Sequence, residues 1–86
     1  MSHIWILANV ASNQTLQPTS YRTLSLAKLM AIGFLERQYI GDGVLPKPVK
    51  QAKNSVLDWN REDDLQIASY SPNGFLELRR VVNGDF

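Results

Sequence analysis

The stretch SLAKLMAIGFLERQYIGDG, residues 25–43, decides the fold class, because it predicts the one long helix of an 86-residue chain. At 100° per residue, its apolar side chains cover nearly every side of that helix. The helix is expected to run to about Tyr39 and to end at the glycine turn of residues 41–43. Three side chains upstream can accept a hydrogen bond from a first-turn amide and so mark its start: Thr19, Ser20 and Thr23.

Strands are predicted on both sides of this helix. HIWILANV (3–10) has apolar residues at odd and even positions, which indicates a central strand buried on both faces. ASNQTLQPTS (11–20) is small, polar and contains a proline, so a loop is expected there. After the helix, residues 55–59, 65–70 and 74–82 predict three strands, and SPNG before the last of them favours a hairpin turn.

These elements predict a single compact domain over residues 1–86, of the α+β class. One helix packs on a small antiparallel sheet in the order β-α-β-β-β. Two prolines, Pro46 and Pro48, exclude a regular helix through that pair, but a short extra helical turn near 48–53 is compatible with them. The first strand joins the sheet either beside the last strand or in the middle, and the sequence leaves both open.

The helix carries more apolar surface than one face of a small sheet covers. Full burial of a large aliphatic side chain is worth about 1.5–3 kcal/mol, so exposed ones weigh heavily on a small domain. Two explanations stay open. Either the segments 11–20 and 44–54 wrap the helix, or the remaining face is an interface with another protein or a second copy. The covering side chains of the first explanation are Leu16, Val44, Leu45 and Val49.

Composition narrows the function classes. The chain is 44% hydrophobic and 20% charged, carries a formal net charge of +1 and has no cysteine. A strongly basic nucleic-acid module, a disulfide framework and a thiolate metal site are therefore excluded. MSHIWILANV lacks a basic leader, and the longest apolar run is far below the ~18–20 residues of a membrane span. We expect a cytoplasmic protein with no membrane association.

The sequence contains no recognisable catalytic or metal-binding pattern. His3 is the only histidine, and nothing nearby in the sequence supplies a partner or a nucleophile for it. Asp58, Asn60 and Glu62 have calcium-loop spacing, but the glycine and glutamate that such a loop needs are replaced by Asp63 and Ser69. We therefore expect an acidic turn, no cofactor, no metal and no catalytic residue.

In size and composition the chain resembles the small accessory proteins that phages and mobile elements encode, including anti-CRISPR inhibitors of host defence. The resemblance implies a non-enzymatic protein-binding module that self-associates or inhibits a larger protein partner by steric occupation. Its expected contacts are the outer helix face and the segment 46–53. The candidate residues are Met30, Phe34, Arg37, Lys47, Lys50 and Lys53.

The alternative is a weak binding protein for RNA or single-stranded nucleic acid, or a small ribonuclease toxin, which the chain resembles in length and in its late run of strands. Basic side chains and aromatic stacking platforms on the last strands would form the contact face. The adjacent acidic residues 58–64, with a net charge of −3, oppose that binding. The candidate residues are Trp59, Arg61, Tyr70, Arg79 and Arg80. Trp59 is also expected, like Trp5, to lie in or near the core.

Overall fold

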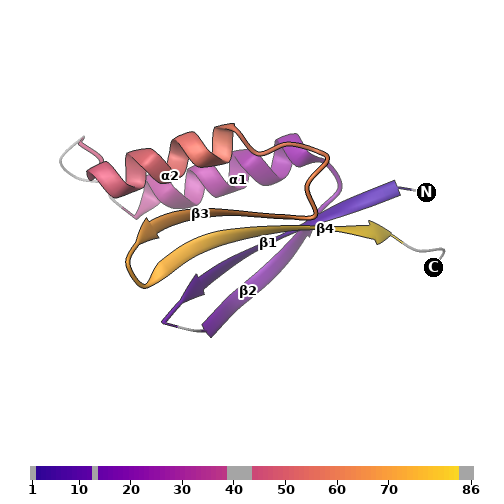
Figure 1. Cartoon of the computed structure of the whole chain (residues 1–86), viewed down its shortest axis with the longest axis horizontal. Helices are drawn as coiled ribbons and strands as arrows, with labels where there is room; N and C mark the ends of the chain where they lie inside the picture. The colour runs from indigo at the N-terminus through magenta and orange to yellow at the C-terminus, as the bar shows by residue number, and fades with distance from the viewer. Residues whose placement is uncertain (1, 13, 39–43, 84–86) are drawn as a thin grey trace.

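The computed structural model describes residues 2–12, 14–38 and 44–83. It is an α+β fold in which two helices pack on an antiparallel sheet of four strands (Figure 1). The predicted fold class is thereby confirmed, but the element order is β-β-α-α-β-β. The elements are β1 (Ser2–Ala11), β2 (Gln14–Tyr21), α1 (Leu24–Arg37), α2 (Lys47–Leu57), β3 (Leu65–Ser71) and β4 (Gly74–Asn83).

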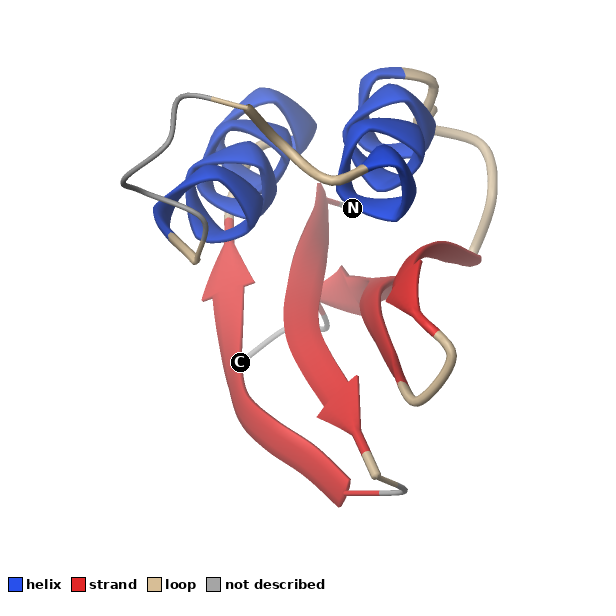
Figure 2. Cartoon of the chain, turned by 90° about the vertical axis from the view of Figure 1, so that its left-hand side faces the viewer, coloured by secondary structure: helices blue, strands red, loops and turns tan. Residues whose placement is uncertain are grey.

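The strands lie in the order β2-β1-β4-β3, so β1 is central and pairs with both β2 and β4. Its predicted central position is confirmed, and it lies beside the last strand as well. The predicted burial on both faces is wrong, because the helices cover only one side of the strand and Ile4, Ile6 and Val10 on the other side are partly exposed. Two hairpins, β1–β2 and β3–β4, thus meet along β1 and β4. Both helices lie on the same side of this sheet, as Figures 1 and 2 show. Within the described residues, no element covers the opposite side.

The predicted loop 11–20 is wrong for most of its length, because β2 occupies residues 14–21. Its polar sequence is that of an edge strand whose exposed side chains face water. Between Leu7 and Asn9 the pairing with β2 shifts register, and Gln17 has a φ of 42°. Pro18 follows this irregularity, where an edge strand tolerates the missing amide.

The predicted strand 55–59 is also wrong, because α2 continues through Leu57. One face of α2 is fully buried and consists of Val49, Ala52 and Val56, a spacing of three and four residues. Pro48 lies in the first turn, where backbone amides have no partner inside the helix, so the proline costs no hydrogen bond. The helical turn predicted near 48–53 is the first half of this longer helix.

Of the three predicted helix starts, Thr23 is confirmed, whereas Thr19 and Ser20 lie in β2. The Thr23 hydroxyl accepts a hydrogen bond of 3.1 Å from the Leu26 amide and thereby caps α1. The helix ends at Arg37, and the predicted end near Tyr39 and the glycine turn 41–43 lie outside the described residues. No described helix is both long enough and apolar enough to span a membrane.

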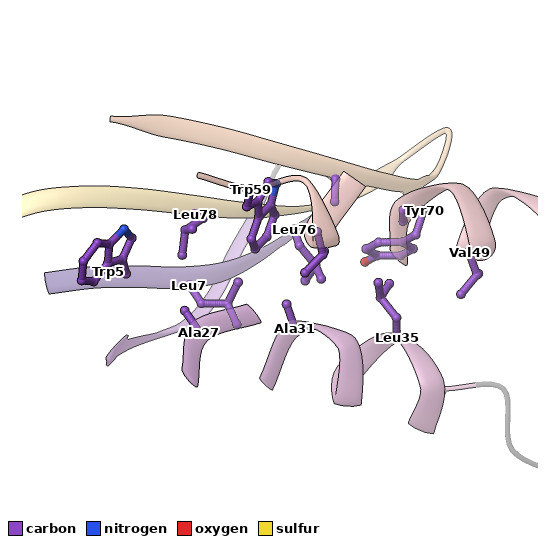
Figure 3. Close-up of a cluster of buried hydrophobic side chains, with 13 residues drawn as sticks. Trp5, Leu7, Ala27, Ala31, Leu35, Val49, Trp59, Tyr70, Leu76 and Leu78 are labelled. Atoms are coloured by element: carbon purple, nitrogen blue, oxygen red, sulfur yellow. The ribbon is translucent and has the colours of Figure 1, made fainter. Parts of the chain in front are cut away.

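The core lies between the helices and the sheet (Figure 3). From the sheet it takes alternate residues of β1 and β4, such as Leu7, Leu76 and Leu78. Trp5 and Trp59 are 4% and 5% exposed, which confirms that both tryptophans are core residues. From α1 it takes the buried stripe of Ala27, Ala31 and Leu35.

A second helix is what covers much of α1. Leu45 and Val49 pack into the core beside it, as the covering explanation expected for segment 44–54. Val44 is 66% exposed and covers nothing, and the side chain of Leu16 lies outside the described ones. Leu26 and Leu29 of α1 stay exposed, so the helix keeps part of its apolar surplus. The two helices are also tied at one end by Lys28, whose ammonium donates to the carbonyls of Leu57 and Trp59 at 2.7 and 2.8 Å.

Candidate interaction surfaces

The side of the sheet opposite the helices, called the open face below, is a largely apolar surface that no described element covers. Strand pairing defines it, because directly paired residues point to the same side. Ile6, Arg79 and Leu65 form one row across the sheet, and Ala8, Glu77 and Ile67 form the next. The apolar side chains of the open face are Ile4, Ile6, Ala8, Val10, Leu65, Ile67, Phe75 and Val81.

This face is unusual for an antiparallel sheet with one side in water, where outward residues are normally polar. Leu65 and Ile67 on β3 are 52% and 55% exposed. Two charges lie at the centre of β4, where Glu77 and Arg79 are joined at 3.5 Å between Oε1 and a terminal guanidinium nitrogen. The polar residues Thr15 and Ser20 of β2 close one border. The open face is therefore apolar around a central pair of opposite charges.

A groove runs along the other side of the molecule, between α1 and the hairpin β1–β2. Its volume is about 690 Å³. Three of the predicted contact residues, Met30, Phe34 and Arg37, form its helical wall, and Thr19 and Tyr21 of β2 stand opposite. The Arg37 guanidinium lies against Gly33, close to where a Cβ would be. The structure thus brings the whole predicted helix-face set, half of the six predicted contact residues, into one hollow.

The three predicted lysines do not join that groove. Lys47 and Lys50 are exposed on α2, which packs over β3, whereas the groove lies on the β2 side of α1. Lys53 crosses between the helices, and its ammonium is 3.1 Å from Glu36 Oε2. The predicted partner-binding set is therefore divided between two sides of the helical layer.

The predicted nucleic-acid face is not assembled as one surface. Trp59 and Tyr70 are 5% and 9% exposed and pack in the core, so neither offers a free ring for stacking. Arg79 lies on the open face, whereas Arg80 lies on the helix side and pairs with Asp64 at 2.8 Å. Arg80 also donates to the backbone carbonyl of Arg61. The reason is strand alternation, which sends consecutive arginines to opposite sides.

A smaller hollow lies where β1 and α1 both begin. Arg22 and Arg61 line it together with His3 and the first residues of α1, and no carboxylate side chain belongs to its described lining. The first turn of α1 has no acidic residue, so its free amides add positive potential there. The indole N–H of Trp5, which also lines it, is buried without a hydrogen-bond partner in the described structure. The hollow is therefore lined by two arginines and by the amide end of α1, and its potential is positive.

Neither the histidine nor the acidic turn forms a recognised chemical centre. His3 lies near the start of β1, 6.4 Å from the Trp5 ring between centroids. In the acidic turn, the side chain of Asn60 accepts from the amides of Glu62 and Asp63 at 2.9 and 3.0 Å, so it closes a local turn. Among the described side chains, no three histidines, aspartates or glutamates are grouped to hold a metal ion.

No family model, curated protein or solved structure that was compared matches this chain. The functional argument therefore depends on surfaces alone. Sequence analysis missed the open face, although its signal was present: β1 is apolar at consecutive positions from Ile4 to Leu7, and the helices cover only one of its two sides.

Proposed function

We propose that the chain is a non-enzymatic protein-binding module that self-associates or inhibits a larger protein partner by steric occupation. The observation that carries this proposal is the open face, which no element covers among the described residues. Its Leu65 and Ile67 are more than half exposed, and its other apolar side chains, apart from the buried Ala8, are partly exposed. Apolar patches of this extent on a small protein are characteristic of protein contacts. A central pair of charges inside an apolar surround supplies orientation without making the patch polar.

The groove beside α1 supports the inhibitory form of this function. It lies on the opposite side of the sheet from the open face, so a chain that self-associates through its sheet keeps the groove free. Met30 and Phe34 offer apolar anchors there, and Arg37 offers a charge at the border. Arginine and aromatic residues are the types that most often dominate the binding energy of protein contacts.

Site-specific photo-crosslinking in cells that express the chain tests this proposal. A photoreactive residue at Ile67 on the open face is expected to give a protein–protein adduct. The same residue at Ser55, which is exposed on α2, is the control and should give none. Adducts of twice 9.7 kDa identify a second copy, and heavier ones identify another protein. Absence of adducts at Ile67, or equal adducts at both sites, would contradict protein binding through this face.

A second candidate function, binding of nucleic acid, is favoured by one observation. Arg22 and Arg61 meet the beginning of α1 in the hollow described above, with no carboxylate in its described lining. Such a site suits a phosphate group, which arginine and free helix amides both bind.

Titration of a single-stranded oligonucleotide at low salt separates this candidate from the first. Arg22→Gln and Arg61→Gln should each weaken binding, whereas Arg79→Gln on the open face should not. Equal affinity in all three variants would remove the hollow as the binding site, and no measurable binding would remove the function.

A further inference from the structure

We propose that the open face is covered by a second copy of the chain, related by a twofold axis that crosses β4 at Leu78. This inference rests on the proposed function and names the partner of the same surface. The axis lies between the two sheets, parallel to them and perpendicular to β4. Each strand then lies over its own copy in the opposite direction, as in an aligned sheet sandwich.

The charges at the centre of the face select this axis. Across it, Glu77 faces Arg79 of the second copy, and Arg79 faces Glu77, so the existing 3.5 Å pair becomes a ring of four alternating charges. An axis through Glu77 or through Arg79 would set that charge against its own copy. An axis parallel to β4 would set Glu77 against Glu77 of the second copy and Arg79 against Arg79. Only the crossing at Leu78 pairs opposite charges along β4.

The side chains around these charges match under the same operation. The axis crosses each of the four strands at one residue of a single paired row. From β3 to β2 this row consists of Gln66, Leu78, Leu7 and Thr19. On β1 the large Ile6 then lies over the small Ala8 of the second copy. The other pairs are Ile4 with Val10, Phe75 with Val81, and Leu65 with Ile67. Every one of these pairs is apolar against apolar, and the Ile6–Ala8 pair sets a large side chain against a small one, as in the packed inner faces of two sheets.

The open face has the extent that such a pair needs. With ten residues in β1 and in β4, the central strands are about 33 Å long, and four strands span about 19 Å. Because β2 and β3 are shorter, with eight and seven residues, the area in projection is about 550 Å², of the same order as the ~800 Å² of accessible surface that each partner buries in a stable interface. Burial of the four charges has a desolvation cost, so they set the orientation while the apolar side chains supply the affinity.

Charge exchange tests the proposal, with mass and dissociation constant measured by sedimentation equilibrium. The unmodified chain is expected to be a dimer of twice 9.7 kDa. Glu77→Arg places arginine against arginine in both halves of the ring, and Arg79→Glu places glutamate against glutamate. Each variant should raise the dissociation constant by about tenfold or more. A mixture of the two variants should dimerise again, because every contact across the interface of the mixed pair is between opposite charges.

The mixture is decisive because the loss of the Glu77–Arg79 pair within one chain is not repaired by mixing. Glu36→Arg makes the same change of charge as Glu77→Arg on the helical layer and should leave the dimer intact, which controls for net charge. Circular dichroism of each variant verifies that it is folded. Any one of three results would overturn the proposal. They are an unmodified chain that is monomeric, single variants that both dimerise as before, and a mixture that stays monomeric. A monomer that still gives heavier crosslinked adducts from Ile67 would overturn the second copy alone and keep the proposed function.

Discussion

The hydroxyl of Tyr70 donates a hydrogen bond of 2.6 Å to Oδ1 of Asn9. The donor belongs to β3 and the acceptor to β1, two strands that β4 separates in the sheet. The tyrosine side chain therefore reaches across β4 on the helix side, where its ring also meets Phe34 of α1 edge-on at 6.2 Å. One side chain thus connects both hairpins and the first helix.

This hydrogen bond should contribute measurably to stability, because it is half-buried and joins residues 61 positions apart. Tyr70→Phe and Asn9→Ala are each expected to lower the free energy of unfolding by about 1 kcal/mol, the usual value of such a bond. In the double variant the losses should overlap, with a coupling of about 1 kcal/mol by urea denaturation. Additive losses would show that the two side chains act independently.

The two described glycines with close neighbours should respond to alanine in opposite directions. A Cβ on Gly74 would lie 2.7 Å from the Tyr70 ring and hydroxyl, so Gly74→Ala should cost about 1–3 kcal/mol of stability. A Cβ on Gly33 would meet only the flexible end of Arg37, at 3.3 Å, and alanine is the better helix former by about 1 kcal/mol. Thermal unfolding should therefore show a lower midpoint for the first variant and a higher one for the second.

Lys28 should matter more than its half-exposed position suggests. Its ammonium holds two carbonyls at the end of α2, which are otherwise without helical partners. Lys28→Met keeps the aliphatic stem and removes both charged hydrogen bonds, with an expected loss of about 1–2 kcal/mol. Lys50→Met, on the exposed side of α2, is the matched control and should change stability by less than about 0.5 kcal/mol. Equal effects in urea denaturation would contradict the capping role.

The ion pair between Lys53 and Glu36 should contribute little, although it also joins the two helices. Its side chains are 34% and 51% exposed, and ion pairs in water are worth about 0–1 kcal/mol. Lys53→Ala is expected to change the free energy of unfolding by less than about 0.5 kcal/mol, and less still at high salt. A loss as large as that of Lys28→Met would show that the pair is better shielded than its exposure implies.

The sequence predicted the parts of the fold whose signals are local. Thr23 caps the helix by its own hydroxyl, SPNG forms the β3–β4 turn, and the apolar run of β1 places it centrally. The errors arose where tertiary contacts override composition. β2 is polar because it is an edge, and Val56 is β-branched yet lies in a helix because its side chain enters the core. Neither context is visible without knowing which elements are neighbours.

The surfaces were harder to predict for a related reason. Surplus apolar residues were expected on the helix, and Leu29 is indeed 65% exposed there. A further uncovered apolar area is on the sheet, because both helices lie on one of its two sides. Met30 and Phe34 were correctly grouped because helical periodicity relates residues on one element. Trp59 and Arg79 were wrongly grouped because their separation depends on strand register.

The irregularity of β2 at Gln17 and Pro18 affects how copies of the chain can aggregate. In fibrils, strands are added edge to edge. This requires a straight edge strand with a regular series of free amides and carbonyls. β2 offers a shifted register and a proline that has no amide hydrogen to donate. Addition of further strands is hindered at this border, so any fibril that copies of the chain form should grow from β3, the other edge of the sheet.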